Sequence, residues 1–223
     1  MAAEGAPCPC PFASAAALLA LAGGALLASR SGLPPERTPS CCAKPGSVER
    51  NAPATETDAP LPVLGDVPDF SFTERSGRAV ARKDLLGSVW VADFIFTSCA
   101  GTCPAMSLRM AGVHEAIRQE RAALCVSFSV DPDRDTLEAL RAYGDRFSAS
   151  ADRWWFLRGP AEAVHRLEYE GFKMGDPTDY FIHSERFVLV DRQGRIRGWY
   201  HGVDDAKVTD LLRDARLLAR ERP

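Results

Sequence analysis

The sequence lacks the positive charge that a nucleic-acid-binding protein requires. Lys and Arg together number 27 against 30 Asp and Glu, which leaves a net charge of −3. A protein that binds nucleic acid needs a basic face, so we expect no nucleic-acid partner. The chain also has no visible internal repeat, and its 223 residues, 46% of them hydrophobic, are enough for one buried core.

The sequence also lacks the distributed cysteines of a disulfide framework. Its seven cysteines form three close pairs and one single residue: Cys8 with Cys10, Cys41 with Cys42, Cys99 with Cys103, and Cys125. We expect Cys125, which lies in an apolar strand pattern, to be a small core residue. The first two pairs can be metal ligands or unused thiols, and their role stays open.

Charge is missing from residues 12–28, a segment rich in Ala and Leu. A helix of about 17 residues spans about 25 Å, slightly less than the ~30 Å hydrocarbon core of a bilayer. This length suits a signal peptide or a short anchor, and a buried helix is the remaining alternative. Arg30 and Arg37 follow the segment, which fits neither membrane interpretation well. A signal peptide cleaved after Ala28 would need a small residue at the −3 position, where this chain has Leu26. We therefore favour an uncleaved anchor.

The chain before the folded domain therefore divides into two segments. Residues 1–29 are the anchor or signal segment, and residues 30–62, rich in Pro and Ala, are predicted to be a flexible tether. A lipid-anchored start at Cys41 is less favoured, because the three residues before it make a poor lipobox. The folded domain is expected at residues 63–223.

The rest of the chain is organised around Cys99 and Cys103. They follow a run of β-forming residues, 89–96, and precede a helical pattern that begins at Pro104 and extends to about residue 121. The dipole and the free N–H groups at a helix N-terminus favour thiolate over thiol, so we predict two acidic thiols. Such a pair can form a disulfide or bind a soft metal. A structural disulfide or two idle thiols is the alternative.

The remaining pattern predicts an α/β sandwich with a central mixed β-sheet flanked by helices. Strands alternate with helices, and a late hairpin and a helix close the chain. With a thiol pair after the central strand, the expected fold is thioredoxin-like. The other strands are expected at residues 70–73, 79–80, 123–130, 154–157, 186–190 and 196–200, and the other helices at 136–147, 160–169 and 204–219.

His183 is the candidate third ligand among the four histidines. It ends an irregular loop just before a strand, and in a thioredoxin-like sheet this loop faces the start of the central helix. Thioredoxins place a cis-proline here, whereas this chain has none beside His183. A loop histidine bound to backbone is the alternative. His114 and His165 are expected on helices as surface or packing residues, and His201 is a weaker candidate.

Four motifs, in this order, resemble those of the Sco/SenC family of copper-handling proteins. They are Phe96-Thr97-Ser98-Cys99-Ala100-Gly101-Thr102-Cys103-Pro104, Ser129-Val130-Asp131-Pro132-Asp133-Arg134-Asp135-Thr136, Asp179-Tyr180-Phe181-Ile182-His183-Ser184 and Leu189-Val190-Asp191-Arg192-Gln193-Gly194. The match runs from about Leu64 to Leu218. It departs at Ala100 and Leu137, where the family often has proline, and neither position is a candidate ligand.

The resemblance implies a copper site formed by Cys99, Cys103 and His183. Thiolate suits Cu(I), and imidazole can help hold Cu(II). It also implies a membrane-tethered copper chaperone on the periplasmic, extracytoplasmic face of a bacterial-type cytoplasmic membrane. The implied partners are the copper-site subunit of a terminal cytochrome c oxidase, whose dinuclear copper centre is supplied, and other copper chaperones or thiol reductants.

The rival interpretation is an enzyme, a thiol-disulfide oxidoreductase that reduces the cysteines of the target site. One of Cys99 and Cys103 would attack and the other would resolve. The three-residue spacer and the missing cis-proline argue against a general thioredoxin activity, and nothing assembles the pocket of a peroxidase. Asp131 and Arg134 are expected at the same end of the sheet, as an ion pair near the site or as loop and helix caps.

Overall fold

The computed structural model describes residues 60–120, 122–176, 178 and 185–221. The predicted anchor, the tether up to residue 59 and His183 lie outside these residues. Within the described part, no helix has the length and apolar character needed to cross a membrane.

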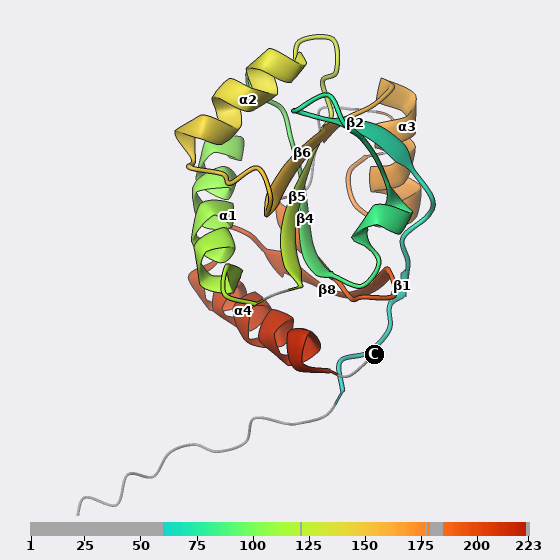
Figure 1. Ribbon diagram of the computed structural model, residues 1–223, viewed down its shortest axis with the longest axis vertical. Coiled ribbons are helices and arrows are strands. Elements are labelled where there is room, and N and C mark those ends of the chain that lie inside the picture. The colour runs from blue at the N-terminus through green and yellow to red at the C-terminus, as the bar shows by residue number, and fades with distance from the viewer. Residues whose placement is uncertain (1–59, 121, 177, 179–184, 222–223) are drawn as a thin grey trace, which may run out of the picture. The chain divides into compact units, whose positions relative to one another are not determined.

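One mixed sheet forms the centre of the described domain (Figure 1). Its strand order is β1-β8-β7-β4-β5-β6-β2-β3, in which β4, β5 and β6 pair in parallel and the other neighbours pair antiparallel. The strands are β1 Gly65–Asp66, β2 Ser71–Glu74, β3 Ala79–Ala81, β4 Val89–Ile95, β5 Ala123–Ser129, β6 Trp154–Arg158, β7 Arg186–Val190 and β8 Arg195–His201. This confirms the predicted mixed sheet, including the early and late hairpins.

Helices cover both faces of the sheet, α1, α2 and α4 on one face and α3 on the other (Figure 1). Their bounds are α1 Cys103–Ile117, α2 Leu137–Arg146, α3 Ala161–Arg166 and α4 Asp205–Arg220, with a 3₁₀ turn at Arg82–Leu85 and a π turn at Leu167–Gly171. The central helix is shorter than predicted at its C-terminal end. The predicted helix at 160–169 is a short α-helix that continues as the π turn.

Strand β4 is central because its side chains are apolar on both faces, apart from Asp93. All seven of its residues are buried, as expected for a strand covered on both sides. Phe94 packs against Phe128 at a ring distance of 5.1 Å on the face that α3 covers. Ile95 belongs to the opposite cluster, with Met110 of α1. Because these neighbouring side chains pack into clusters on opposite faces of the sheet, they fix the end of β4. They thereby also fix the start of the loop that leads to the cysteines.

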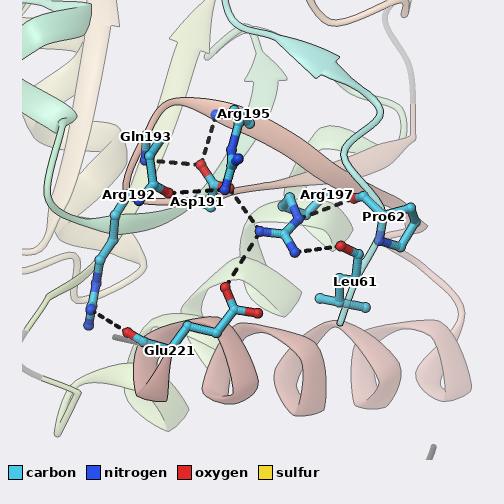
Figure 2. Close-up of polar contacts among 8 residues, drawn as sticks. All are labelled: Leu61, Pro62, Asp191, Arg192, Gln193, Arg195, Arg197 and Glu221. Atoms are coloured by element: carbon cyan, nitrogen blue, oxygen red, sulfur yellow. Dashed lines mark hydrogen bonds and ion pairs between the residues drawn. The ribbon is translucent and has the colours of Figure 1, made fainter. Parts of the chain in front are cut away.

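The end of the sheet opposite the cysteines is held by a buried polar network around Arg197 (Figure 2). Arg197 pairs with Asp191 at 2.9 Å and lies 3.6 Å from a Glu221 carboxylate oxygen. It also donates to the backbone oxygens of Leu61 and Pro62. Thus the last residues of the predicted tether are bound to β8. Burial would raise the pKa of Asp191, but the hydrogen bonds from Arg195 and Arg197, together with backbone N–H donors, hold it below its ordinary value.

Candidate metal centre

Cys99 and Cys103 lie where the parallel part of the sheet ends. Cys99 is half-buried in the turn after β4, and Cys103, only 1% exposed, is the first residue of α1. Neither cysteine forms a disulfide in the structure. The Gly101 N–H donates to the Cys99 sulfur at 3.3 Å, and the Cys99 N–H donates to the Phe96 oxygen at 3.2 Å. The predicted strand–turn–thiol–helix arrangement is therefore confirmed.

The prediction of two acidic thiols is wrong for Cys103. Burial raises the pKa of the Cys103 thiol well above its usual range, and interactions with the Cys99 thiol and the Asp93 carboxylate add to the rise. A hydrogen bond from the Phe96 backbone acts in the opposite direction without cancelling it. The expectation rested on the helix N-terminus and left out the desolvation of a thiol packed under the first turn. A proton must therefore leave Cys103 when a metal binds there.

Asp93 is a second buried titratable group near this end of the molecule, and it was not predicted from the sequence. It is completely buried on β4, and neither carboxylate oxygen has a hydrogen-bond partner among the described residues. Burial raises its pKa to about 7, and the nearby Ser127 side chain offsets only part of this rise. The visible signal was an acidic residue inside an otherwise apolar strand, Val89–Ile95.

Asp93→Asn should stabilise the reduced, metal-free protein at neutral and alkaline pH. The pKa of Asp93 is raised on folding, so its contribution is most favourable below the ordinary value of 3.8 and is lost as the pH rises through about 7. The rise of the pKa from 3.8 to about 7 corresponds to up to about 4 kcal/mol. Urea unfolding of the variant and the parent at about pH 4 and about pH 8 measures this difference.

Asp69→Asn is the matched control, because the Asp69 side chain is 89% exposed. We expect it to change the unfolding free energy little at either pH, since exposed charges contribute at most about 1 kcal/mol. If the gain in Asp93→Asn were the same at acidic and alkaline pH, the buried carboxylate would not be the cause.

The structure leaves the predicted ligand His183 untested, because it lies outside the described residues. The strand that follows it does begin at the right end of the sheet, since β7 runs antiparallel to β4. Gly202 donates to the Glu185 oxygen at 2.8 Å, and a Cβ at Gly202 would collide with Met106 in the first turns of α1. The described chain next to His183 is therefore adjacent to the helix that carries Cys103.

The other three histidines have partners within the domain. The His114 ring lies 2.8 Å from the Ser150 hydroxyl, and the His165 ring lies 2.6 Å from the Asp176 backbone oxygen. His201 is half-exposed and lies 3.8 Å from a Glu185 oxygen. No group of three or more His, Cys, Asp or Glu side chains suited to a metal occurs within the described ranges.

The segment after β5 brings four more polar residues to this end of the sheet. Of the two alternatives left open for Asp131 and Arg134, the structure shows the ion pair, at 3.5 Å, with Asp131 buried and Arg134 mostly exposed. Thr136 caps α2 by accepting from the Ala139 N–H. Asp135, between them, is fully buried and accepts hydrogen bonds from the loop that leads to Cys99. In the sequence Asp135 was visible only as part of a motif, and no role was predicted for it.

Comparison with known proteins identifies the family. The family model described as SCO1/SenC matches residues 65–214. The SCO1 protein homolog of Bacillus subtilis is 31% identical over 161 residues, which is 70% of this chain and 83% of that protein.

Solved structures agree with this match. A SCO1/SenC family lipoprotein from Bacillus anthracis is 34% identical, with a TM-score of 0.66 over 73% of this chain and all of that one. BsSco, described as a member of the Sco family of cytochrome c oxidase assembly proteins with a disulfide switch, is 30% identical, with a TM-score of 0.65 over 74% of this chain and all of that one. Copper-bound ScoI of Bradyrhizobium japonicum, 21% identical over 69% of this chain and 99% of that one, shares the fold at a TM-score of 0.55.

The match covers both the sheet and the loop that carries the thiol pair. The domain has the thioredoxin-like fold of the Sco structures, and two reduced cysteines lie at the end of its central strand. The chain therefore belongs to the SCO1/SenC family.

Proposed function

We propose that this protein is a membrane-tethered copper chaperone that supplies the dinuclear copper site of a respiratory cytochrome c oxidase. Copper is bound as cargo by Cys99, Cys103 and His183. The observation that carries the proposal is the pair of reduced thiols in a SCO1/SenC domain, one half-exposed and one buried, at the start of α1.

The chemistry of the donor set supports Cu(I) as the cargo. Thiolate sulfur is a soft ligand that suits Cu(I), and a neutral imidazole adds a nitrogen ligand that also accommodates Cu(II). Two sulfurs and one nitrogen leave the ion under-coordinated, so a ligand of the receiving protein can enter and take it. Zinc favours a fourth protein ligand in a closed structural site.

The N-terminal segment and one relative support the proposed location, in which copper is transferred at the outer face of the cytoplasmic membrane. Residues 1–29 anchor the chain in the cytoplasmic membrane, residues 30–62 are the tether, and residues 63–223 work on the extracytoplasmic face. The lipoprotein relative from Bacillus anthracis supports a membrane-associated domain. The receiving partner is the copper-site subunit of the oxidase, and other copper chaperones or thiol reductants load and reduce the thiol pair.

His183→Ala tests the proposal in cells that produce the variant in place of the parent. We expect oxidase activity to be largely lost, because a two-thiol site holds copper more weakly. Excess copper in the medium should restore at least part of the activity, since mass action refills a weakened site. Respiratory oxidase activity with and without added copper is the measurement.

His201→Ala is the matched control, because His201 lies at the same end of the sheet and its ring contacts Glu185 only at 3.8 Å. It should keep the activity of the parent without added copper. Parental activity of the His183→Ala cells under the same conditions would exclude the three-ligand chaperone.

One observation favours a second function, thiol-disulfide exchange with the cysteines of the target site. Half-exposed Cys99 can attack a partner disulfide, while buried Cys103 is placed to resolve the mixed disulfide. The related BsSco carries a disulfide switch. If purified His183→Ala reduces a target disulfide as fast as the parent while its cells keep normal oxidase activity, reduction is the main function.

A further inference from the structure

The carboxyl group of Asp135 binds the loop between β4 and the thiol pair. Its Oδ1 accepts from the Thr97 hydroxyl at 2.6 Å and from the Thr97 N–H at 3.1 Å. Its Oδ2 accepts from the Ser129 hydroxyl at 2.6 Å. Asp135 is completely buried, and no ion pair reaches it within the described part of the chain. These three groups therefore account for its polar contacts there.

The backbone that Asp135 holds adjoins Phe96, and the Phe96 backbone contacts both cysteines. Thr97 follows Phe96, whose backbone oxygen accepts from the Cys99 N–H at 3.2 Å. The Phe96 backbone also hydrogen-bonds the Cys103 thiol. The segment 96–97 is thus bound by Asp135 on one side and by the two cysteines on the other.

We propose that Asp135 is a positioning residue for the thiol pair, acting through Thr97 and Phe96. None of the four hydrogen bonds that the Asp135 carboxylate accepts among the described residues comes from a sulfur. Asp135 fixes the segment 96–97, whose backbone binds the Cys99 N–H and the Cys103 thiol. The inference rests on the proposed function of the pair, and it adds a residue that sets the balance between the dithiol and the disulfide.

The balance is measurable against glutathione, without copper. Two electrons and two protons pass from Cys99 and Cys103 to glutathione disulfide; the Cys99–Cys103 bond forms, the glutathione disulfide bond breaks, and two glutathione thiols are released. The protein is the full chain with serine at the four cysteines that lie outside the described residues. Because Cys103 and Cys125 are both buried, the quenched protein is denatured before its thiols are trapped. Cys125 then adds one constant thiol, and the rest of the count reports on the pair.

Asp135→Asn should shift this equilibrium about tenfold toward the disulfide, which is about 30 mV for a two-electron couple. The amide replaces an acceptor oxygen by a donor that faces either the Ser129 hydroxyl or Thr97. The loop then loses the fixed position in which the Phe96 backbone binds the Cys103 thiol and the Cys99 N–H. An equilibrium within about twofold of the parent, or a shift toward the dithiol, would overturn the proposal.

Asp191→Asn separates positioning from a general loss of stability. Asp191 is also a buried carboxyl group that accepts from backbone N–H groups, those of Gln193 and Arg195, but it lies at the opposite end of the sheet. We expect it to lower the unfolding free energy and leave the glutathione equilibrium unchanged. A shift as large as that of Asp135→Asn would show that destabilisation alone moves the equilibrium, and would also overturn the proposal.

Thr97 provides a second route if Asp135→Asn does not fold. Thr97→Val removes only the hydroxyl contact and should shift the equilibrium about threefold toward the disulfide, whereas Thr97→Ser keeps the hydroxyl and should match the parent. Equal values for these two variants would overturn the proposal. The proposed copper-binding function is tested separately, by titrating the parent protein with Cu(I). The glutathione equilibrium contains no copper, so failure of one proposal can be told from failure of the other.

Discussion

Cys103→Ser is expected to abolish tight Cu(I) binding. The parent should bind about one Cu(I) per chain, and serine oxygen is too hard a ligand to replace a thiolate for this ion. A loss of at least about a thousandfold in affinity is expected, since one strong ligand is removed from three. Competition with a chromophoric Cu(I) chelator under anaerobic, reducing conditions measures it. Cys99→Ser should behave in the same way.

Cys125→Ser is the matched control for this titration. Cys125 is a free thiol that is completely buried in β5, and it belongs to the cluster beneath α1 and α4. Its replacement can cost stability because a hydroxyl is buried in place of a thiol, but it should leave the copper affinity unchanged. Tight Cu(I) binding by Cys103→Ser would contradict the proposed ligand set.

Arg197→Met is expected to destabilise the domain strongly without touching the thiol pair. The variant leaves the buried Asp191 carboxylate without one partner and the carbonyl oxygens of Leu61 and Pro62 without their donor. Removing one partner of a buried ion pair costs about 3–5 kcal/mol. The change in denaturant midpoint, with the slope checked for two-state behaviour, measures the loss.

Arg195→Met is the control, because Arg195 pairs with the same Asp191 oxygen at 2.8 Å but its side chain is 36% exposed. Solvent screens the charge of a partly exposed side chain, so we expect the unfolding free energy to fall by at most about 1 kcal/mol. Copper affinity should be unchanged in both variants, since the network lies at the opposite end of the sheet from Cys103. Equal losses for Arg197→Met and Arg195→Met would contradict the importance of burial.

The fold was largely predictable because its central features depend on local pattern. The β-forming run up to residue 96 could only be a buried strand, and Cys99, Cys103 and Pro104 directly after it marked the start of a helix. Element ends were less predictable, because they depend on contacts that residue type does not reveal. The central helix stops at Ile117, and the helix after β6 changes to a π turn at Leu167.

The site was predictable in its residue types but not in its electrostatics. Sequence spacing correctly placed Cys99 and Cys103 at the start of the central helix. For Asp131 and Arg134 it left an ion pair and capping roles open, and the structure shows the ion pair. Spacing could not show that Cys103 is desolvated, since burial depends on which side chains cover the first turn of α1. The His183 prediction still rests on the loop order and on the family resemblance.

By itself, the sequence determined the mixed sheet, the place of the thiol pair and the family, because hydrophobic period and motif order are properties of neighbouring residues. Only the tertiary structure decided the roles of Asp135 and Arg197, which contact residues 38 and 136 positions away, Thr97 and Leu61. It also decided that the Asp93 carboxylate is buried with no hydrogen-bond partner among the described residues. The physical reason is that hydrogen bonding and desolvation depend on distance in space, and residues far apart in the chain set both.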